Sequence, residues 1–245
     1  MNNKKLELSK IFSWTITGIV LIISLLMVWL LRTPQQITAM LEKISSDLKI
    51  YAVVAHIIFI IMFISGIIFK KARNIIFPVL MLLVSVSATV VAVFYFIPPN
   101  IIIYGLYSIL IIFAFINRKF DFDIDKLSFL SQTAGFIVII MGLWYLHWVE
   151  KPIMLNALIF SPLGIANCPT MLVICGILIL NTNSKSYLLE AVAGLSTLFI
   201  GFMGIFRLQA YVDVFLIVAA LFILIRIGSY LSFNQFFLKG TGNER

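Results

Sequence analysis

Residues 75–97 read IIFPVLMLLVSVSATVVAVFYFI, an apolar run without a charged side chain. A helix of about 20 apolar residues crosses a hydrocarbon core of about 30 Å, so this run predicts a membrane-spanning helix. Basic residues precede it in Lys70-Lys71-Ala72-Arg73-Asn74, and Pro98-Pro99-Asn100 follows it. The rest of the chain repeats this arrangement of long apolar runs separated by short polar breaks.

The composition places the chain in the membrane class. Hydrophobic residues make up 62% of the 245 positions and charged residues 11%, whereas a soluble domain is about half apolar and about a quarter charged. No stretch is polar enough for a separate soluble domain, so residues 1–245 are expected to form one integral membrane domain. The net charge of +8 comes from basic residues that flank apolar runs, which indicates lipid headgroups as partners and not nucleic acid.

The apolar runs predict an all-α, polytopic membrane helix bundle of about eight transmembrane helices, the first of them a retained span. They cover Phe12–Leu31, Ile50–Phe69, Ile75–Ile97, Ile101–Ile116, Phe129–Val149, Cys168–Leu180, Tyr187–Phe206 and Tyr211–Ile227.

The distribution of Lys and Arg predicts the orientation. With the N-terminus in the cytoplasm, thirteen of the 18 basic residues fall on the inner side and five on the outer side, as the positive-inside rule requires. We therefore expect a cell (inner) membrane protein with residues 1–11 and the tail 228–245 both in the cytoplasm.

Residues Gln35–Leu48 predict an amphipathic helix. Apolar residues recur there at helical spacing with charged residues between them, which is typical of a helix lying on the membrane surface, here the outer one. The apolar positions are Ile37, Met40, Leu41, Ile44 and Leu48.

Three prolines, Pro152, Pro162 and Pro169, interrupt the apolar stretch before Leu180. Proline removes a backbone donor and usually ends or breaks a helix. We expect Leu155–Ile165 to form a re-entrant segment, followed by a helix too short to cross the membrane. Irregular backbone at that depth is tolerated only inside protein or beside a cavity.

The motif Asn167-Cys168-Pro169-Thr170 is the strongest candidate site, and Thr170 is included in it. Pro169 suits the first helical position, so Cys168 or Asn167 would cap the helix, and the helix dipole would favour the thiolate. The Cys-Pro pair is similar to that of metal-pumping ATPases. Met171 and Cys175 follow Cys168 on the same face, and their sulfur atoms suit a soft metal ion. The alternative is a plain helix cap, with both residues packed as apolar side chains.

The two histidines extend this metal hypothesis. His56 and His147 fall toward the outer side, so His56 with Cys168 and Cys175 could bind zinc or copper. The alternatives are a hydrogen-bonded structural role for His56, and an interfacial aromatic belt around His147.

Other charged residues have simpler interpretations. Asp213 begins the last span, so it either complements the helix dipole or pairs with Arg207 across the turn. Asp121, Asp123 and Asp125 alternate in a polar loop that lacks the glycine and the final glutamate of a calcium loop, so a solvated loop is expected.

Catalytic motifs are missing from the sequence. It holds no His-Glu-x-x-His pair and no Walker lysine loop, and no span centre carries Asp or Glu for a proton relay. These absences make an enzyme the less favoured class and leave the question open.

The motif Cys168-Pro169-Thr170 with Met171–Leu180, and the stretch Ala193–Gly204 with residues 207–213, also support a resemblance. From Phe136 onward the chain resembles an uncharacterised prokaryotic family of multi-spanning membrane proteins, a domain of unknown function. Asn167 stands where that family's pattern has proline. The resemblance implies a shared Cys-Pro-Thr element, and it implies no activity or cofactor.

These observations lead to two main hypotheses, and a membrane enzyme with a Cys168 nucleophile ranks last because no base is assembled beside it. The first is a small permease or binding protein with an outward-facing site around Cys168 for a soft metal ion or another small solute. The second is a subunit of a larger membrane complex, or of a homo-oligomer, with no site of its own. Gly194, Gly201 and Gly204 suit close helix–helix contact in both cases.

Overall fold

The computed structural model describes the backbone of residues 3–145, 161–182 and 185–240, and within these ranges all regular structure is helical. The helices are α1 (Asn3–Leu30), α2 (Pro34–Asp47), α3 (Lys49–Ile68), α4 (Arg73–Phe94), α5 (Pro98–Ile116), α6 (Phe129–Leu143), α8 (Asn167–Ile179), α9 (Tyr187–Leu208) and α10 (Val214–Gly240), with short 3₁₀ turns η1 (Lys70–Ala72), η2 (Ile124–Lys126) and η3 (Tyr211–Asp213).

Local signals explain where several helices begin. Thr33 caps α2: its hydroxyl accepts from the N–H of Gln36, and the Gln36 side chain accepts from the N–H of Thr33. Pro34 follows at the first helical position, where its missing N–H costs no hydrogen bond. Pro98 and Pro99 likewise occupy the first two positions of α5. Ser128 caps α6, because its side chain accepts from the N–H of Ser131.

The expected all-helical architecture is confirmed, at a coarser level than eight spans. In the part of the chain that the structure describes, five helices are long and apolar enough to cross a membrane, or six if α1 and α2 form one bent span. The described parts of α6 and α8 have 15 and 13 residues, fewer than the roughly 20 that a crossing needs.

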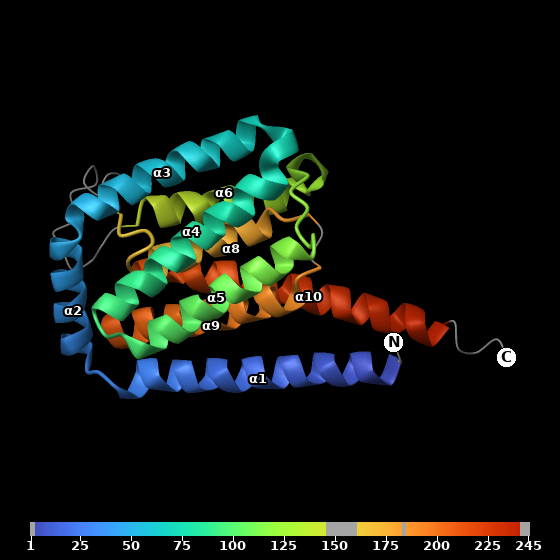
Figure 1. The fold of residues 1–245 in the computed structure, drawn as a ribbon, viewed down its shortest axis with the longest axis horizontal. Helices are drawn as coiled ribbons and strands as arrows, with labels where there is room; N and C mark the ends of the chain where they lie inside the picture. The colour runs from blue at the N-terminus through green and yellow to red at the C-terminus, as the bar shows by residue number, and fades with distance from the viewer. Residues whose placement is uncertain (1–2, 146–160, 183–184, 241–245) are drawn as a thin grey trace.

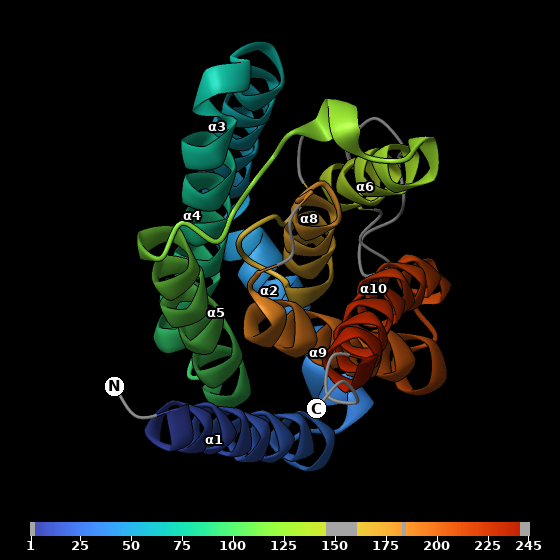
Figure 2. The same cartoon turned by 90° about the vertical axis from the view of Figure 1, so that its right-hand side faces the viewer.

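Helix α8 occupies the centre of the bundle. It packs against α4, α6, α9 and α10, and Figure 2 shows it surrounded by them. Residues 169–179 are all buried. A helix that is apolar on every side must be enclosed by protein or lipid, and here other helices enclose it.

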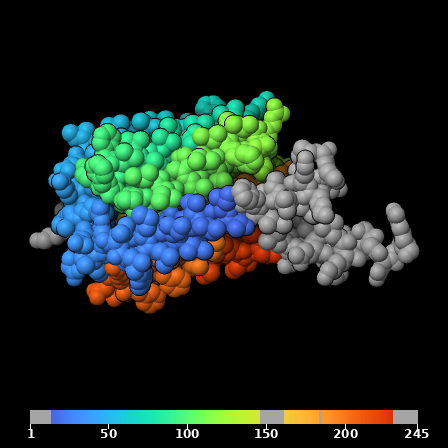
Figure 3. Space-filling view, turned by 60° about the horizontal axis from the view of Figure 1, so that its bottom comes forward, coloured from blue at the N-terminus to red at the C-terminus, as the bar shows by residue number. Residues whose placement is uncertain are grey.

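Helices α1 and α2 form a bracket around one side and one end of the bundle (Figure 1). The axis turns by 98° between them. Figure 3 shows α1, in blue, lying between the green α5 and the orange α9, and both contacts are present. The N-terminal end of α1 and the C-terminal end of α10 lie at the end of the molecule opposite to α2 (Figure 1).

Three arginines bind the C-terminal ends of helices other than their own. Arg73 donates to the carbonyls of Gly66 and Ile67 at the end of α3, both at 3.0 Å. Arg207 donates to the carbonyls of Trp29 and Arg32 at the end of α1.

Arg226 does the same for α8, with donor–acceptor distances of 2.8–3.2 Å. Its acceptors are the carbonyls of Leu178, Ile179 and Asn181. The last carbonyls of a helix have no partner within it and carry partial negative charge, so each guanidinium satisfies them and complements the dipole.

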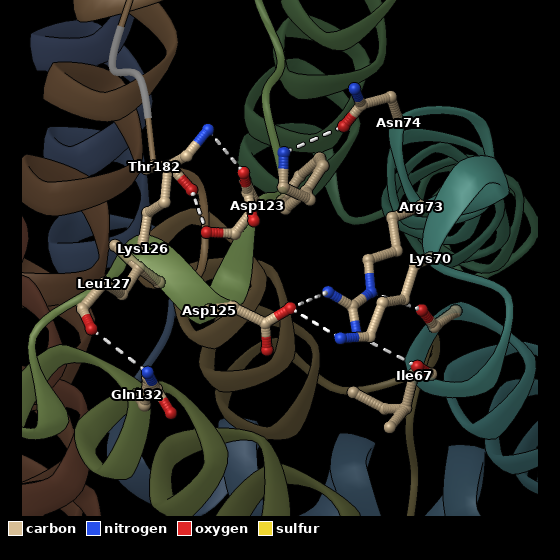
Figure 4. A network of polar contacts seen from close by, with 12 residues as sticks. Ile67, Lys70, Arg73, Asn74, Asp123, Asp125, Lys126, Leu127, Gln132 and Thr182 are labelled. Atoms are coloured by element: carbon tan, nitrogen blue, oxygen red, sulfur yellow. Dashed lines mark hydrogen bonds and ion pairs between the residues drawn. The ribbon is translucent and has the colours of Figure 1, made fainter.

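The loop that carries Asp121, Asp123 and Asp125 is held by both sides of the bundle (Figure 4). Asn74 accepts from the N–H of Phe122, and the Thr182 hydroxyl donates to the carbonyl of Asp123. Asp125 pairs with Lys70 at 2.7 Å, and Asp123 pairs with Lys126 at 2.6 Å. Two of the three carboxylates are therefore neutralised by lysines.

Candidate functional site

A cavity of about 110 Å³ lies at the α2 end of the bundle. The C-terminal ends of α1 and α9 and the N-terminal ends of α5 and α8 converge there, and α2 closes the end. Its walls are mostly apolar, and its polar residues are Arg32, Asn100, Tyr145, Asn167, Cys168 and Asp213.

Asp213 joins two of these residues. Its Oδ1 accepts from the Tyr145 hydroxyl at 2.5 Å, and its Oδ2 accepts from the Cys168 thiol at 3.5 Å. Asp213 and Tyr145 are buried, whereas Cys168 is partly exposed. A buried carboxylate is costly unless it is hydrogen-bonded, and these two donors partly offset that cost. The three groups form a thiol–carboxyl–phenol cluster at the wall of the cavity.

Gly204 makes room for this cluster. A Cβ atom built on Gly204 would collide with the carboxylate of Asp213. The neighbouring turn sets the position of Asp213. The C-cap of α9, Gln209, has the left-handed conformation with φ 57°, and the N–H of Ala210 donates back to the carbonyl of Gly204. Such a helix end satisfies one free carbonyl and redirects the chain.

Two amides form the second polar group of the cavity. Asn167 Nδ2 donates to Asn100 Oδ1 at 3.1 Å, and the Tyr104 hydroxyl donates to the main-chain carbonyl of Asn167. The Oδ1 atom of Asn167 is buried and has no hydrogen-bond partner among the described residues. An unpaired buried acceptor is costly, so this atom is a natural contact for a donor in the cavity.

Thr170 shapes the approach to α8 and does not line the cavity. Its hydroxyl donates to the carbonyl of Ala166 and accepts from the N–H of Gly164. Gly164 has φ +70°, a conformation that favours glycine. Pro162 begins this turn, because its carbonyl accepts from the N–H groups of Ile165 and Ala166.

The prediction that Cys168 or Asn167 caps α8, with Pro169 as its first residue, was wrong. The helix begins at Asn167, and Ala166 is the N-cap with no side-chain hydrogen bond. Pro169 is therefore the third helical residue. The first N–H groups of a helix have no partner within it, so proline is tolerated there as well. The described part of the preceding segment, residues 161–166, is non-helical.

The structure does not bring the predicted metal ligands together. Cys175 and Met171 are fully buried, and Cys175 contacts the Thr197 hydroxyl at 3.2 Å. His56 is buried on α3, and its Nδ1 has no partner in the described ranges. Across those ranges no three His, Cys, Asp or Glu residues form a metal-binding group.

The remaining candidates have separate positions. Arg207 does not pair with Asp213: its hydrogen bonds go to the end of α1, which draws the guanidinium away from the carboxylate. His147, Pro152 and most of the proposed re-entrant segment lie outside the described residues.

Sequence reasoning missed Asn100 and Tyr145 and did not join Cys168 to Asp213, because these residues are far apart in the chain. One available signal was Asn100 itself, a polar side chain at the start of an apolar span. Polar residues in spans usually face the protein interior.

Comparisons with known proteins identify no relative of this chain. No protein family matches it, and neither curated proteins nor solved structures include a match.

Proposed function

We propose that the chain is a small permease or binding protein whose site is the cavity beside Cys168. The carrying observation is the convergence of Asn100, Asn167, Cys168 and Asp213 on an apolar cavity. Small-molecule sites have this character: apolar walls give affinity, and a few placed polar groups give orientation.

The polar groups favour a small polar solute. The cavity offers amide, thiol and carboxyl groups. The Oδ1 atom of Asn167, which has no partner in the described part of the chain, can accept from a donor. The cavity volume of about 110 Å³ is several times the roughly 10–15 Å³ that a single water needs, so a small solute fits inside it.

A soft metal ion is the second candidate, supported by the sulfur atoms of the cavity. Met27, Met40, Met203 and Cys168 all contribute to its walls, and thioethers and thiolates suit soft ions such as Cu⁺. Arg32 contacts the sulfur of Met40, and its positive charge disfavours a cation. The small polar solute therefore ranks first.

For the whole protein we propose about eight spans in the inner membrane, with both termini cytoplasmic, the cavity facing outward and α2 on the outer surface. The basic residues support this orientation. The short helices α6 and α8 would then count as two of these spans. They need not cross the whole bilayer, because the surrounding helices replace lipid around them.

Labelling of the two cysteines in intact cells tests the site. A small, membrane-impermeant methanethiosulfonate is expected to modify Cys168 in the Cys175→Ser variant, detected by mass. The matched Cys168→Ser variant retains only the fully buried Cys175 and is expected to stay unmodified. Binding of Cu⁺ that Cys168→Ser abolishes would favour the soft metal, and an accessible Cys168 without such Cu⁺ binding would favour the solute. An unmodified Cys168 would contradict an outward-facing cavity.

The alternative is an accessory subunit of a membrane complex. Its test is whether native purification recovers stoichiometric partners together with an unreactive Cys168. Gly194 and Gly201 could have served contact with a helix of another subunit. Instead they face α10 of the same chain, because a Cβ at either position would lie 2.8–2.9 Å from α10 side chains. These glycines already serve packing within the molecule.

A further inference from the structure

A second cavity lies at the opposite end of the bundle, between α1, α5 and the start of α9. Its volume is about 440 Å³. One part of its wall is apolar and the other part is basic and polar. The residues are Trp14, Leu110, Phe113, Ala114, Lys119 and residues 185–189.

The polar part combines two lysines with a buried hydroxyl. Ser186 is 5% exposed, and its Oγ has no hydrogen-bond partner among the described residues. Ser186 is also the N-cap of α9, yet its side chain makes no capping bond. Lys119 and Lys185 lie on the same wall. The hydroxyl is therefore available to a ligand that enters between two positive charges.

The start of α9 adds to the preference for an anion. Residues 187–189 of its first turn line the cavity, and a helix N-terminus carries partial positive charge and N–H groups that lack intrahelical acceptors. Glu190 in the same turn is fully buried and lies 3.2 Å from Arg226, and it is not part of the wall. Within the described ranges, no ion pair involves Lys119 or Lys185.

The apolar part continues from this basic end toward the membrane interior. Leu110, Phe113 and Ala114 follow α5 away from Lys119, and the side chain of Trp14 is 44% exposed. Tryptophan and lysine at one level are typical of the boundary between headgroups and acyl chains. An anion with an apolar tail therefore matches the whole wall, whereas a free anion matches only its basic end.

We propose that this second cavity, an open groove between α1, α5 and the start of α9, binds one anionic phospholipid. Its phosphate lies at the start of α9 between Lys119, Lys185 and Ser186, and an acyl chain lies against α5 beside Trp14. Charge complementarity with an anionic leaflet selects this occupant. The inference does not depend on the Cys168 cavity.

Native mass spectrometry of the detergent-purified protein tests the proposal, with phosphatidylglycerol and phosphatidylcholine as probes. A lysine near an anionic surface contributes about 1 kcal/mol, or about fivefold. The Lys119→Ala/Lys185→Ala variant is therefore expected to bind phosphatidylglycerol roughly 25-fold more weakly. Ser186→Ala removes an unpaired hydroxyl, so it is expected to fold normally and to weaken binding severalfold.

The matched control is Lys71→Ala/Lys126→Ala, which removes the same charge from exposed positions outside the groove and is expected to retain the lipid. Equal loss in both double variants would overturn the proposal, and so would phosphatidylcholine binding as tight as phosphatidylglycerol binding. Displacement of the lipid by inorganic phosphate alone at millimolar concentration would show a free-anion site and would also overturn it. If the lysine variant fails to fold, Ser186→Ala decides alone.

Discussion

Asp213 connects the polar groups on one wall of the Cys168 cavity, because its two carboxylate oxygens accept from different residues. Its place at the start of the last span suggested a dipole partner or a pair with Arg207. The structure gives it Cys168 and Tyr145 as donors, from segments 45 and 68 residues away along the chain. Local sequence reports which residues are polar, but long-range packing decides which of them meet.

Asp125 was expected to lie in a solvated loop, and it is exposed, but Lys70 contacts it. This contact is again long-range, 55 residues apart in the chain. The hydrogen bond and the charge of Lys70 lower the pKa of Asp125. The alternating Asp pattern gave no sign of the lysine partner.

We predict that Lys70→Ala raises the pKa of Asp125 toward the model-peptide value of about 3.9. Because the folded pKa lies below the unfolded one, the stabilisation by this pair is complete above the unfolded pKa and is lost as the pH falls through the folded value. Titration of ¹³C-labelled aspartate carboxyls by NMR measures the shift. Lys71→Ala is the control and should leave it unchanged; an Asp125 pKa that stays low in Lys70→Ala would contradict the prediction.

At the scale of elements, helices α6 and α8 approach each other through glycines. A Cβ on Gly176 of α8 would lie 2.5 Å from the Ile139 side chain and 3.0 Å from the carbonyl of Gly135. A Cβ on Gly142 of α6 would lie 2.9 Å from the carbonyl of Pro169. Small residues allow this close approach between membrane helices.

We therefore predict that Gly176→Ala destabilises the protein by about 1–3 kcal/mol, the usual cost of overpacking. Gly105→Ala is the matched control: apart from its own helix backbone and chain neighbours, no atom of the described residues lies within 4 Å of the added Cβ. Alanine also favours a helix by roughly 0.5–1 kcal/mol. Thermal unfolding midpoints in detergent compare them. Equal midpoints would show that α8 adjusts its distance from α6.

The Glu190–Arg226 pair is another element-scale feature, because it joins α9, α10 and the end of α8. Glu190 is fully buried, and Arg226 is the one cation paired with it among the described residues. In the sequence, Arg226 contributed only to the count of basic residues on the inner side, and nothing there indicated its partners. Its three carbonyl partners required the structure.

Replacing Arg226 by Leu is predicted to destabilise the protein by about 3–5 kcal/mol, because a buried carboxylate then loses its counter-charge and the end of α8 loses its cap. Glu190→Gln removes the buried charge and keeps that cap, so its unfolding midpoint should fall less. Both midpoints are measured in the same detergent. A Glu190→Gln protein less stable than Arg226→Leu would reverse this order and refute the argument.

At the scale of the whole molecule, the sequence predicted the all-helical membrane class, the helix after Thr33 and the short helix near Pro169. It did not predict that α8 would be the centre of the bundle. The signal was present, since a helix that is apolar on all sides needs enclosure. The choice of enclosing helices depends on side-chain fit, which apolar composition does not encode.

The N-terminal end of α1 and the C-terminal end of α10 lie at the same end of the bundle (Figure 1), and the basic residues predict that this end is cytoplasmic. Green fluorescent protein fused after Arg245 should therefore fluoresce, and alkaline phosphatase fused after Pro34 should be active. The reciprocal fusions serve as controls and should be silent. An active phosphatase after Arg245 would reverse the proposed orientation.

The arginines that bind the ends of α1, α3 and α8 carry a consequence for biogenesis. During insertion, the translocation machinery responds to positive charge, and lysine would serve it equally well. After insertion, the planar fork of arginine reaches two or three carbonyl oxygens together, which a single ammonium group does less well. Exchange of these arginines for lysine should therefore preserve the topology of the chain but weaken the packing of its helices. Such variants would separate the effect of positive charge on insertion from its effect on stability.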